Sequence, residues 1–338
     1  VLTLSNQAIS AQPLLAFPQR SLKHRHSLLR QKMAGKNRRH PIQQSHLCTA
    51  ESVSQDTPTF RATALSTALW SLVCGMMAAR VLFFFMTFPL MATEIIAHRG
   101  ASVRAPENTV AAFRLAWELE TDACELDLHL TADGEIAVLH DKDTHRTAAI
   151  QKIVAETAMA DLKKLDVGAW KDGMYSGEPI PTLMEALATL PEGKQRFFLE
   201  IKCGPEVVPV LAQQLQSWKP RAAQLCIIAF KRDVAQDAKK ALPWLKVYRL
   251  SSELTKTKQP VDLKALIAET VADGLDGLDL SQDFPLDAES VKAVRAAGLE
   301  LYLWTVNRPE VARRFLELGV DGLTTDDPVM LRRVLEKK

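Results

Sequence analysis

Cysteine, glycine and proline are all scarce in this sequence. Only five of the 338 residues are cysteine, and none of them forms a C-x-x-C pair. So few and so scattered thiols exclude a disulfide scaffold and argue against a thiolate zinc site. We therefore expect reduced thiols and a reducing compartment such as the cytoplasm. Glycine and proline together fill only 31 positions, which excludes collagen-like and low-complexity chains.

The main part of the chain also lacks an excess of positive charge. The net charge of the whole sequence is +2 at pH 7, but it is unevenly distributed. Residues 1–91 hold ten basic and two acidic side chains, so residues 92–338 hold 32 basic and 38 acidic ones. Because nucleic-acid binding depends on a positively charged surface, we expect no nucleic-acid partner for the main part.

The N-terminal residues 1–92 are predicted to be an extension that precedes the ordered domain. Residues 1–60 are polar, basic and without apolar periodicity, which predicts a disordered extension. Within a hydrophobic segment at 61–92, residues 62–79 are uncharged and reach the lower limit for a membrane helix. They could anchor the protein in the inner membrane, which would bring membrane contact. Because Arg80 interrupts the apolar run, we favour a dispensable leader, and we expect a chain beginning at Met91 to be soluble and fully active.

From residue 93 to 338, short apolar runs alternate with helical patterns, as expected of one domain. Strands are predicted at 94–98, 124–128, 196–202, 224–230, 246–250, 277–280, 299–306 and 320–325. Helices are predicted at 107–120, 182–190, 262–274, 288–298, 309–319 and 327–337. Eight strands alternating with helices indicate a (β/α)8 TIM barrel, an α/β fold. A doubly wound sheet is the alternative, but no glycine-rich turn follows the first strand. The loop-like stretch 141–181 predicts a small insertion after the second strand, above the barrel mouth.

Three carboxylates lie on predicted strands whose other residues are apolar. Glu125 and Asp127 are two residues apart and so share one face of the second strand, and Glu200 lies near the end of the third. Each alone could form a buried salt bridge or lie at a solvated strand end. Together at one barrel mouth they would repel one another unless they held a cation. Carboxylate oxygens suit one hard divalent ion, Mg2+ or Ca2+, whereas zinc prefers histidine or cysteine.

Basic residues end the same strands. Arg99 and Lys202 next to a cation indicate a site for a phosphate oxyanion. His98 and His140, on different strands, supply one proton acceptor and one proton donor. His129 and His145 are weaker candidates, because they lie past a strand end and in a loop. The combination indicates cleavage of a phosphodiester.

These motifs resemble those of the glycerophosphodiester phosphodiesterase family over about residues 94–330. The matching segments are AHRGASVRAPENTVAAF (97–113), CELDLHLTADGEIAVLHD (124–141), LDVGAW (165–170), EPIPTLMEAL (178–187), FLEIK (198–202), WTVN (304–307) and DGLTTDDP (321–328). The resemblance, closest to compact cytosolic bacterial members, implies a TIM-barrel hydrolase of lipid and glycerol metabolism. Such an enzyme cleaves glycerophosphodiesters, the deacylated phospholipid head groups, to sn-glycerol 3-phosphate and an alcohol.

The resemblance also implies roles for single residues. It implies metal binding at Glu125, Asp127 and Glu200, an acid/base pair at His98 and His140, and phosphate contacts at Arg99 and Lys202. In the mechanism proposed for the family, the glycerol 2-hydroxyl attacks phosphorus and a cyclic phosphate forms. Which histidine is the acid stays open, with His98 favoured. Trp304 is expected to pack against the glycerol carbons, the alternative being ordinary core packing.

Two other functions remain as alternatives. The same site in a lysophospholipase D would act on lysophospholipids, which retain one acyl chain. A different class, a non-catalytic phosphoester-binding protein, would be expected to have lost a histidine or a carboxylate, and all are present. The sequence makes no prediction of the oligomeric state.

Overall fold

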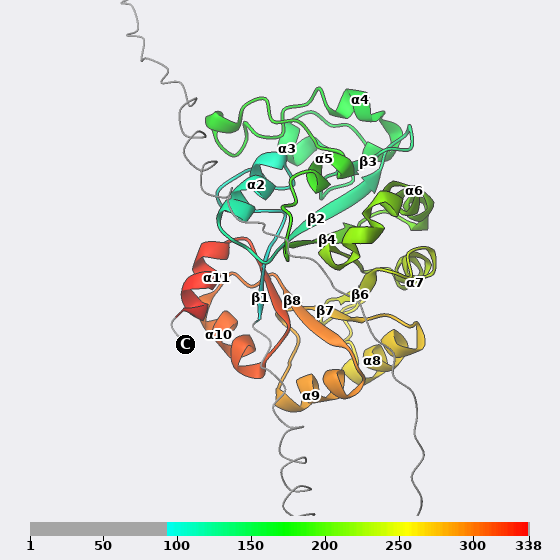
Figure 1. Cartoon of the computed structure of the whole chain (residues 1–338), viewed down its shortest axis with the longest axis vertical. Coiled ribbons are helices and arrows are strands. Elements are labelled where there is room, and N and C mark those ends of the chain that lie inside the picture. The colour runs from blue at the N-terminus through cyan, green and yellow to red at the C-terminus, as the bar shows by residue number, and fades with distance from the viewer. Residues whose placement is uncertain (1–92, 337–338) are drawn as a thin grey trace, which may run out of the picture. The chain divides into compact units, whose positions relative to one another are not determined.

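The computed structural model describes residues 93–336 of the chain (Figure 1). The predictions for 1–60 and for 61–92, including an anchor at 62–79, lie outside the described residues. Among residues 93–336, no helix is both long enough and apolar enough to cross a bilayer.

Eight parallel strands close into a barrel in the described part of the chain. Their bounds are β1 Glu94–Ala97, β2 Ala123–Leu130, β4 Arg196–Ile201, β5 Leu225–Ala229, β6 Lys246–Ser251, β7 Gly277–Ser281, β8 Glu300–Trp304 and β9 Gly322–Thr325. Each strand pairs with the next, and β1 pairs with both β2 and β9, which closes the ring. This confirms the predicted (β/α)8 barrel.

Helices cover the outside of the barrel (Figure 1). Their bounds are α2 Val110–Glu118, α5 Leu183–Leu187, α6 Val208–Gln214, α7 Arg232–Ala241, α8 Leu263–Ala272, α9 Ala288–Ala296, α10 Pro309–Leu318 and α11 Pro328–Leu335, with the 3-10 segments η3 Pro205–Val207 and η4 Leu215–Gln224. Short polar side chains begin several of them: Thr109, Asp262, Asp287 and Asp327 each accept a hydrogen bond from a first-turn amide. At the end of α10, Gly319 adopts the left-handed conformation that stops a helix before the next strand.

Alternation along β2 separates the core from the site. Leu126 and Leu128 pack in the apolar layer between strands and helices, and the intervening Glu125 and Asp127 point the other way, into the barrel. Lower in the barrel, Phe198, Tyr248 and Tyr302 fill the interior with ring centroids 4.9–5.9 Å apart. A filled interior leaves the carboxyl ends of the strands as the place for a cavity.

The insertion after the second strand is present and is built around its own core. It begins past β3 Ile136–Val138, which pairs antiparallel with β2, and contains α3 His145–Ala148, η1 Val154–Glu156, α4 Met159–Leu162 and η2 Gly173–Tyr175. Apolar side chains of the insertion form a separate cluster that includes Val154, Leu162 and Val167. Hydrogen bonds tie it to the loop between β1 and α2. Among them, Lys171 Nζ donates to the Ser102 carbonyl oxygen (2.6 Å), and Tyr175 donates to the Arg104 carbonyl oxygen (3.1 Å).

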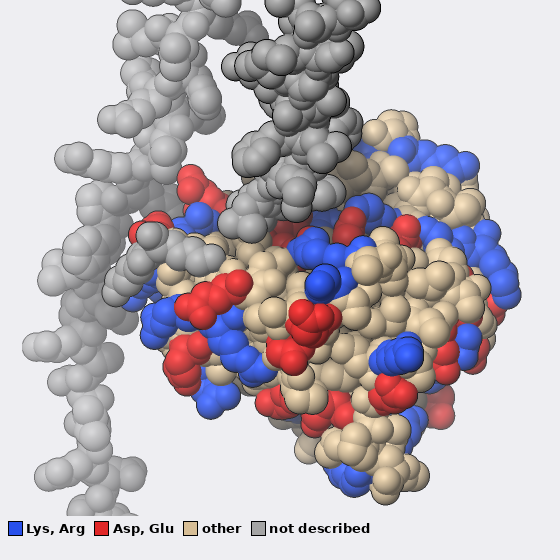
Figure 2. All heavy atoms as spheres, turned by 90° about the horizontal axis from the view of Figure 1, so that it is seen from below, with Lys and Arg blue, Asp and Glu red and all other residues tan. Residues whose placement is uncertain are grey.

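Charges of both signs are mixed on the surface. On the face drawn in Figure 2, basic and acidic side chains of the described part alternate, and neither sign forms a continuous field.

Candidate active site

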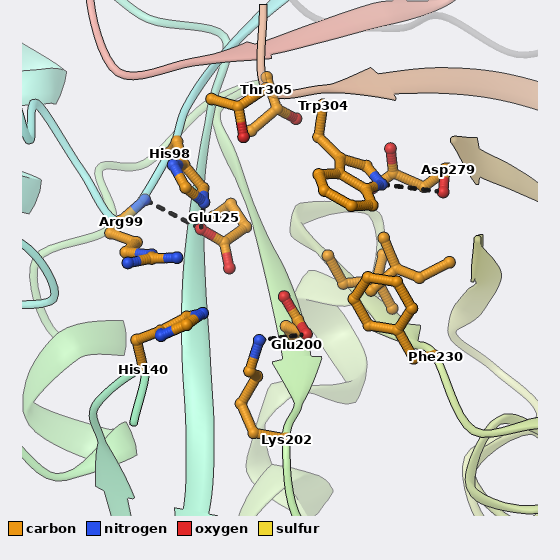
Figure 3. Close-up of a pocket in the computed structure, with 13 residues that line it drawn as sticks. His98, Arg99, Glu125, His140, Glu200, Lys202, Phe230, Asp279, Trp304 and Thr305 are labelled. Atoms are coloured by element: carbon orange, nitrogen blue, oxygen red, sulfur yellow. Dashed lines mark hydrogen bonds and ion pairs between the residues drawn. The ribbon is translucent and has the colours of Figure 1, made fainter. Parts of the chain in front are cut away.

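A cavity of about 180 Å3 opens at the carboxyl ends of the barrel strands (Figure 3). Its lining residues are His98, Arg99, Glu125, His140, Glu200, Lys202, Ile228, Phe230, Leu250, Asp279, Trp304, Thr305 and Thr324. Seven of the eight residues predicted for the site are in this list. The eighth, Asp127, is completely buried beside them and contacts Arg99 and Lys202.

The three predicted metal ligands form one cluster. Asp127 on β2 is directly paired in register with Glu200 on β4, and Glu125 lies one step lower on the same face of β2. All three side chains are buried, and one carboxylate oxygen from each lies within 4.8 Å of the others. Strand pairing therefore brings together three acids that are up to 75 residues apart in sequence.

The electrostatics of the cluster favour a bound cation. Burial, and then the charges of Asp127 and Glu200, raises the pKa of Glu125 well above its usual range. Burial, and then Asp127, raises the pKa of Glu200 to about 7. Glu125 Oε1 and Asp127 Oδ1 are buried and accept no hydrogen bond, which costs ~1–3 kcal/mol or more for each charged group. Buried oxygens that accept no hydrogen bond from the described residues, at this spacing, fit a hard divalent cation.

Arg99 and Lys202 offset part of this negative charge. Arg99 Nε lies 3.2 Å from Asp127 Oδ2, and Lys202 Nζ lies 2.8 Å from Glu200 Oε1 and 3.5 Å from Asp127 Oδ1. Burial alone would raise the pKa of Asp127, but these two cations hold it below its usual value. Both cations also face the cavity, where they can contact an anionic ligand.

The turn after β1 presents its backbone as well as its side chains. Arg99 has a φ of 54°, and its backbone N–H donates to Glu125 Oε2 at 2.9 Å. Gly100 follows with a φ of 80°, and a Cβ there would lie 2.7 Å from the Ala112 carbonyl carbon. Glycine is therefore required for this turn to pack against α2.

His98 is held by the end of β9. Its Nδ1 lies 2.6 Å from Asp326 Oδ1, and the other oxygen of Asp326 accepts a hydrogen bond from Asn307 Nδ2 at 2.5 Å. The remaining ring nitrogen, Nε2, faces Glu125 Oε2 at 3.9 Å. This orientation leaves Nε2 directed at the carboxylate cluster.

His140 is held in the same way, through the insertion. Its Nδ1 lies 2.7 Å from Asp141 Oδ1, and Arg146 Nε donates to Asp141 Oδ2 at 2.7 Å. The rest of the Arg146 guanidinium donates to both oxygens of Glu107 (2.7 and 2.8 Å), which also accepts from Arg99 Nη1 at 2.9 Å. Burial lowers the pKa of His140, and Arg99 and Lys202 add to this effect against the opposing charge of Asp127. His140 is thus linked to Arg99 through Asp141, Arg146 and Glu107.

Aromatic side chains form the wall opposite the histidines. Trp304 donates its indole N–H to the Asp279 carbonyl oxygen at 3.2 Å, and Phe230 meets its ring edge-on at 5.5 Å. Figure 3 shows Trp304 lying between the histidine side of the cavity and Asp279. This wall provides an apolar surface beside a strongly charged one.

A family model described as the glycerophosphoryl diester phosphodiesterase family matches residues 98–330. The chain belongs to this family. Its predicted family resemblance is thereby confirmed, and the matched range contains every residue that lines the cavity.

Relatives with this name align along nearly all of their own length. A glycerophosphodiester phosphodiesterase of Caldanaerobacter subterraneus is 33% identical over 254 residues, which is 73% of this chain and 99% of the relative. One from Bacillus subtilis is 30% identical and aligns over 71% of this chain and 85% of its own. Among solved structures, an Oleispira antarctica phosphodiesterase in complex with the product sn-glycerol-3-phosphate is 28% identical, with a TM-score of 0.65 over 72% of this chain and 96% of that one.

Sequence reasoning missed several residues of this phosphodiesterase-family site. Asn108, with a φ of 59°, donates to Asp127 Oδ2 at 2.7 Å and accepts from the Asp127 backbone N–H at 3.2 Å. Asn108, Asp326 and Asn307 all lie inside segments that carry the family resemblance, but no spacing rule connects them to their partners. Of the weaker candidates, His129 Nε2 lies 3.2 Å from the His140 carbonyl oxygen, and His145 begins α3 at the surface.

Proposed function

We propose that this protein hydrolyses glycerophosphodiesters to sn-glycerol 3-phosphate and an alcohol. The observation that carries the proposal is one small cavity lined by two buried carboxylates, two oriented imidazoles and two cations, with the third carboxylate, that of Asp127, buried directly beside them. Family membership and the names of the relatives support the same reaction. A non-catalytic binding protein would not need proton donors and acceptors beside the phosphate contacts.

Glu125, Asp127 and Glu200 would hold one divalent cation, Mg2+ or Ca2+. When bound, the ion would polarise a phosphoryl oxygen and stabilise charge that develops on it. Arg99 and Lys202 would contact the other phosphate oxygens, because both lie at the cavity wall next to the acids. Trp304 would cover the glycerol carbons with its indole face.

The two histidines would divide the proton transfers. His140, whose lowered pKa favours the neutral ring, would take the proton from the glycerol 2-hydroxyl as its oxygen attacks phosphorus. Carboxylates face both ring nitrogens of His98, so each N–H of the charged ring would face an acceptor. His98 would give its proton to the alcohol oxygen as the bond to phosphorus breaks. Water would then open the cyclic phosphate, with the proton transfers reversed.

A cytoplasmic location is part of the proposal. The three cysteines in the described part of the chain, Cys124, Cys203 and Cys226, are all unpaired, as is common for proteins in a reducing compartment.

A substrate panel tests the reaction against a lysophospholipase D. Purified protein is incubated with glycerophosphocholine, glycerophosphoethanolamine and lysophosphatidylcholine, and release of glycerol 3-phosphate or lysophosphatidic acid is measured. We expect glycerol 3-phosphate from the first two and a far lower rate on the third. A higher rate on lysophosphatidylcholine would replace the proposal with the lysophospholipase D, and no turnover of any diester would refute both.

A further inference from the structure

Asp279 is a buried carboxyl group at the cavity wall that no group among residues 93–336 satisfies. It lies on β7, is 1% exposed and lines the cavity. Its Oδ1 is buried without a hydrogen-bond partner, and neither carboxyl oxygen joins an ion pair with any described residue. A buried carboxyl group without a hydrogen-bond partner destabilises the folded protein unless a bound ligand provides that partner.

The flanking strands offer Asp279 no alternative partner. On β6 the residue in register is Leu250, which is apolar. On β8 it is Tyr302, whose hydroxyl already donates to Glu300 and accepts from Arg196. The nearby indole N–H of Trp304 is used by the main-chain oxygen of Asp279, not by its side chain. The carboxyl group is therefore open only toward the cavity.

The surroundings favour a neutral donor over a cationic one. Lys202 Nζ lies 5.9 Å from the centre of the Phe230 ring, which packs edge-on against Trp304, so this wall already holds a positive charge. Burial, and secondarily Glu200, raises the pKa of Asp279 well above its usual range. A hydroxyl group suits such a carboxyl group, because it can donate to it or accept from it.

The position of Asp279 indicates which hydroxyl reaches it. In Figure 3, Asp279 lies across the cavity from His98 and His140, on the far side of Trp304. If the glycerol 2-hydroxyl reacts near the histidines, the remaining free hydroxyl, at sn-1, lies at the far end of the glycerol. We propose, on the basis of the proposed function, that Asp279 accepts a hydrogen bond from the sn-1 hydroxyl and is a specificity-determining residue for it.

This contact explains how the enzyme would distinguish its substrates from lysophospholipids. A fatty acyl ester at sn-1 removes the hydroxyl hydrogen and adds a chain, so the Asp279 carboxyl group would stay buried without a donor. The cavity, at about 180 Å3, is also smaller than the ~300–1,000 Å3 of pockets that enclose drug-sized ligands. Sites built to bond a substrate hydroxyl discriminate strongly against analogues that lack it.

Two substrates and three variants test the proposal. The substrates are glycerophosphocholine and its 1-deoxy analogue, the phosphocholine ester of propane-1,2-diol, which keeps the reacting hydroxyl. For the unaltered protein, kcat/KM is expected to fall on the order of 10²-fold or more from the first substrate to the second. In Asp279→Leu, kcat/KM should fall by a similar factor on glycerophosphocholine and change little on the analogue. Asp279→Asn keeps an acceptor, so its kcat/KM on glycerophosphocholine should lie between those of the unaltered protein and Asp279→Leu.

Ser281→Ala is the matched control, because Ser281 is buried on the same face of β7 and its hydroxyl is bonded to the Asp283 backbone N–H. This variant should cleave both substrates at rates within about threefold of those of the unaltered protein, as expected for a substitution away from the contact. An equal loss on both substrates in Asp279→Leu would show a structural role and overturn the inference. Equal rates of the unaltered protein on both substrates would also overturn it while leaving the proposed function intact. Failure to cleave glycerophosphocholine at all would refute the proposed function itself.

Discussion

His98 and His140 come from different parts of the chain but are held alike. Each has a carboxylate on Nδ1, Asp326 in one case and Asp141 in the other, and both rings line the cavity. The strand period alone predicts that Glu125 and Asp127 share a face. It does not predict Asp326 as the partner of His98, because that contact depends on how β9 ends beside β1.

Replacing His140 with alanine tests the proton transfer at the level of one residue. His140→Ala should lower kcat by ~10²–10⁴-fold, because a positioned acid or base contributes about that much. The substitution leaves the barrel core untouched, so the melting temperature should change little. His145→Ala, at the surface start of α3, is the control and should retain normal turnover. A His140→Ala protein with normal kcat would remove this residue from the mechanism.

The carboxylate cluster predicts cation-dependent stability. Ca2+ or Mg2+ should raise the melting temperature of the protein, because a ligand that binds the folded state stabilises it. Glu125→Gln should reduce this shift by removing one charged ligand, whereas Glu317→Gln, at an exposed position on α10, should not. Scanning calorimetry with and without each cation measures the effect. Equal shifts in all three proteins would place the cation elsewhere.

At the level of elements, the insertion positions the site without lining the cavity. The four-residue helix α3 places Arg146 where it joins Glu107 to Asp141, although no residue of 141–181 is among the lining residues. The strands are predictable from their apolar runs, because strands buried inside a barrel consist mostly of apolar residues. The short helices of the insertion are not, because their stability comes from a tertiary cluster and not from local periodicity.

Arg146 should act by positioning His140 and Arg99. Arg146→Lys keeps the charge but loses the fork that bonds two carboxylates at once. We expect kcat to fall by roughly 10-fold to 10²-fold with a small change in KM, because a slight misplacement of reacting groups is enough for such a loss. Steady-state kinetics separate the two constants. A rise in KM at constant kcat would instead make Arg146 a substrate-binding residue.

Asp166 should make the insertion sensitive to acid. Its carboxylate accepts hydrogen bonds from the backbone N–H groups of Gly168, Ala169 and Gly177 at 2.8–3.0 Å. These bonds lower the pKa of Asp166 from 3.8 to about 2. A lowered pKa stabilises the fold above the unfolded value and loses that contribution as the pH falls toward 2. Asp166→Asn should therefore melt below the unaltered protein at pH 7, and the difference should shrink between pH 4 and pH 2. A difference independent of pH would contradict this.

At the level of the whole molecule, the residues that stabilise the barrel and the polar residues of the candidate site lie in different parts of it. Phe198, Tyr248 and Tyr302 close the lower interior, and the polar residues gather at the carboxyl ends of the strands. The number of strands predicts the fold, and the spacing and charge of the three acids predict their cluster. The role of Asp279 is not predictable from the sequence, because an acid on an apolar strand can be identified as unsatisfied only when its neighbours are known.

The most direct test of the account is glycerol 3-phosphate release from glycerophosphocholine before and after removal of divalent cations. The unaltered protein is treated with EDTA, dialysed, and assayed alone and after separate addition of Ca2+ and Mg2+. We expect chelation to reduce the rate by at least ~10²-fold and at least one of the two cations to restore it. Undiminished turnover in the presence of chelator would contradict the claim that Glu125, Asp127 and Glu200 serve this reaction by holding a cation.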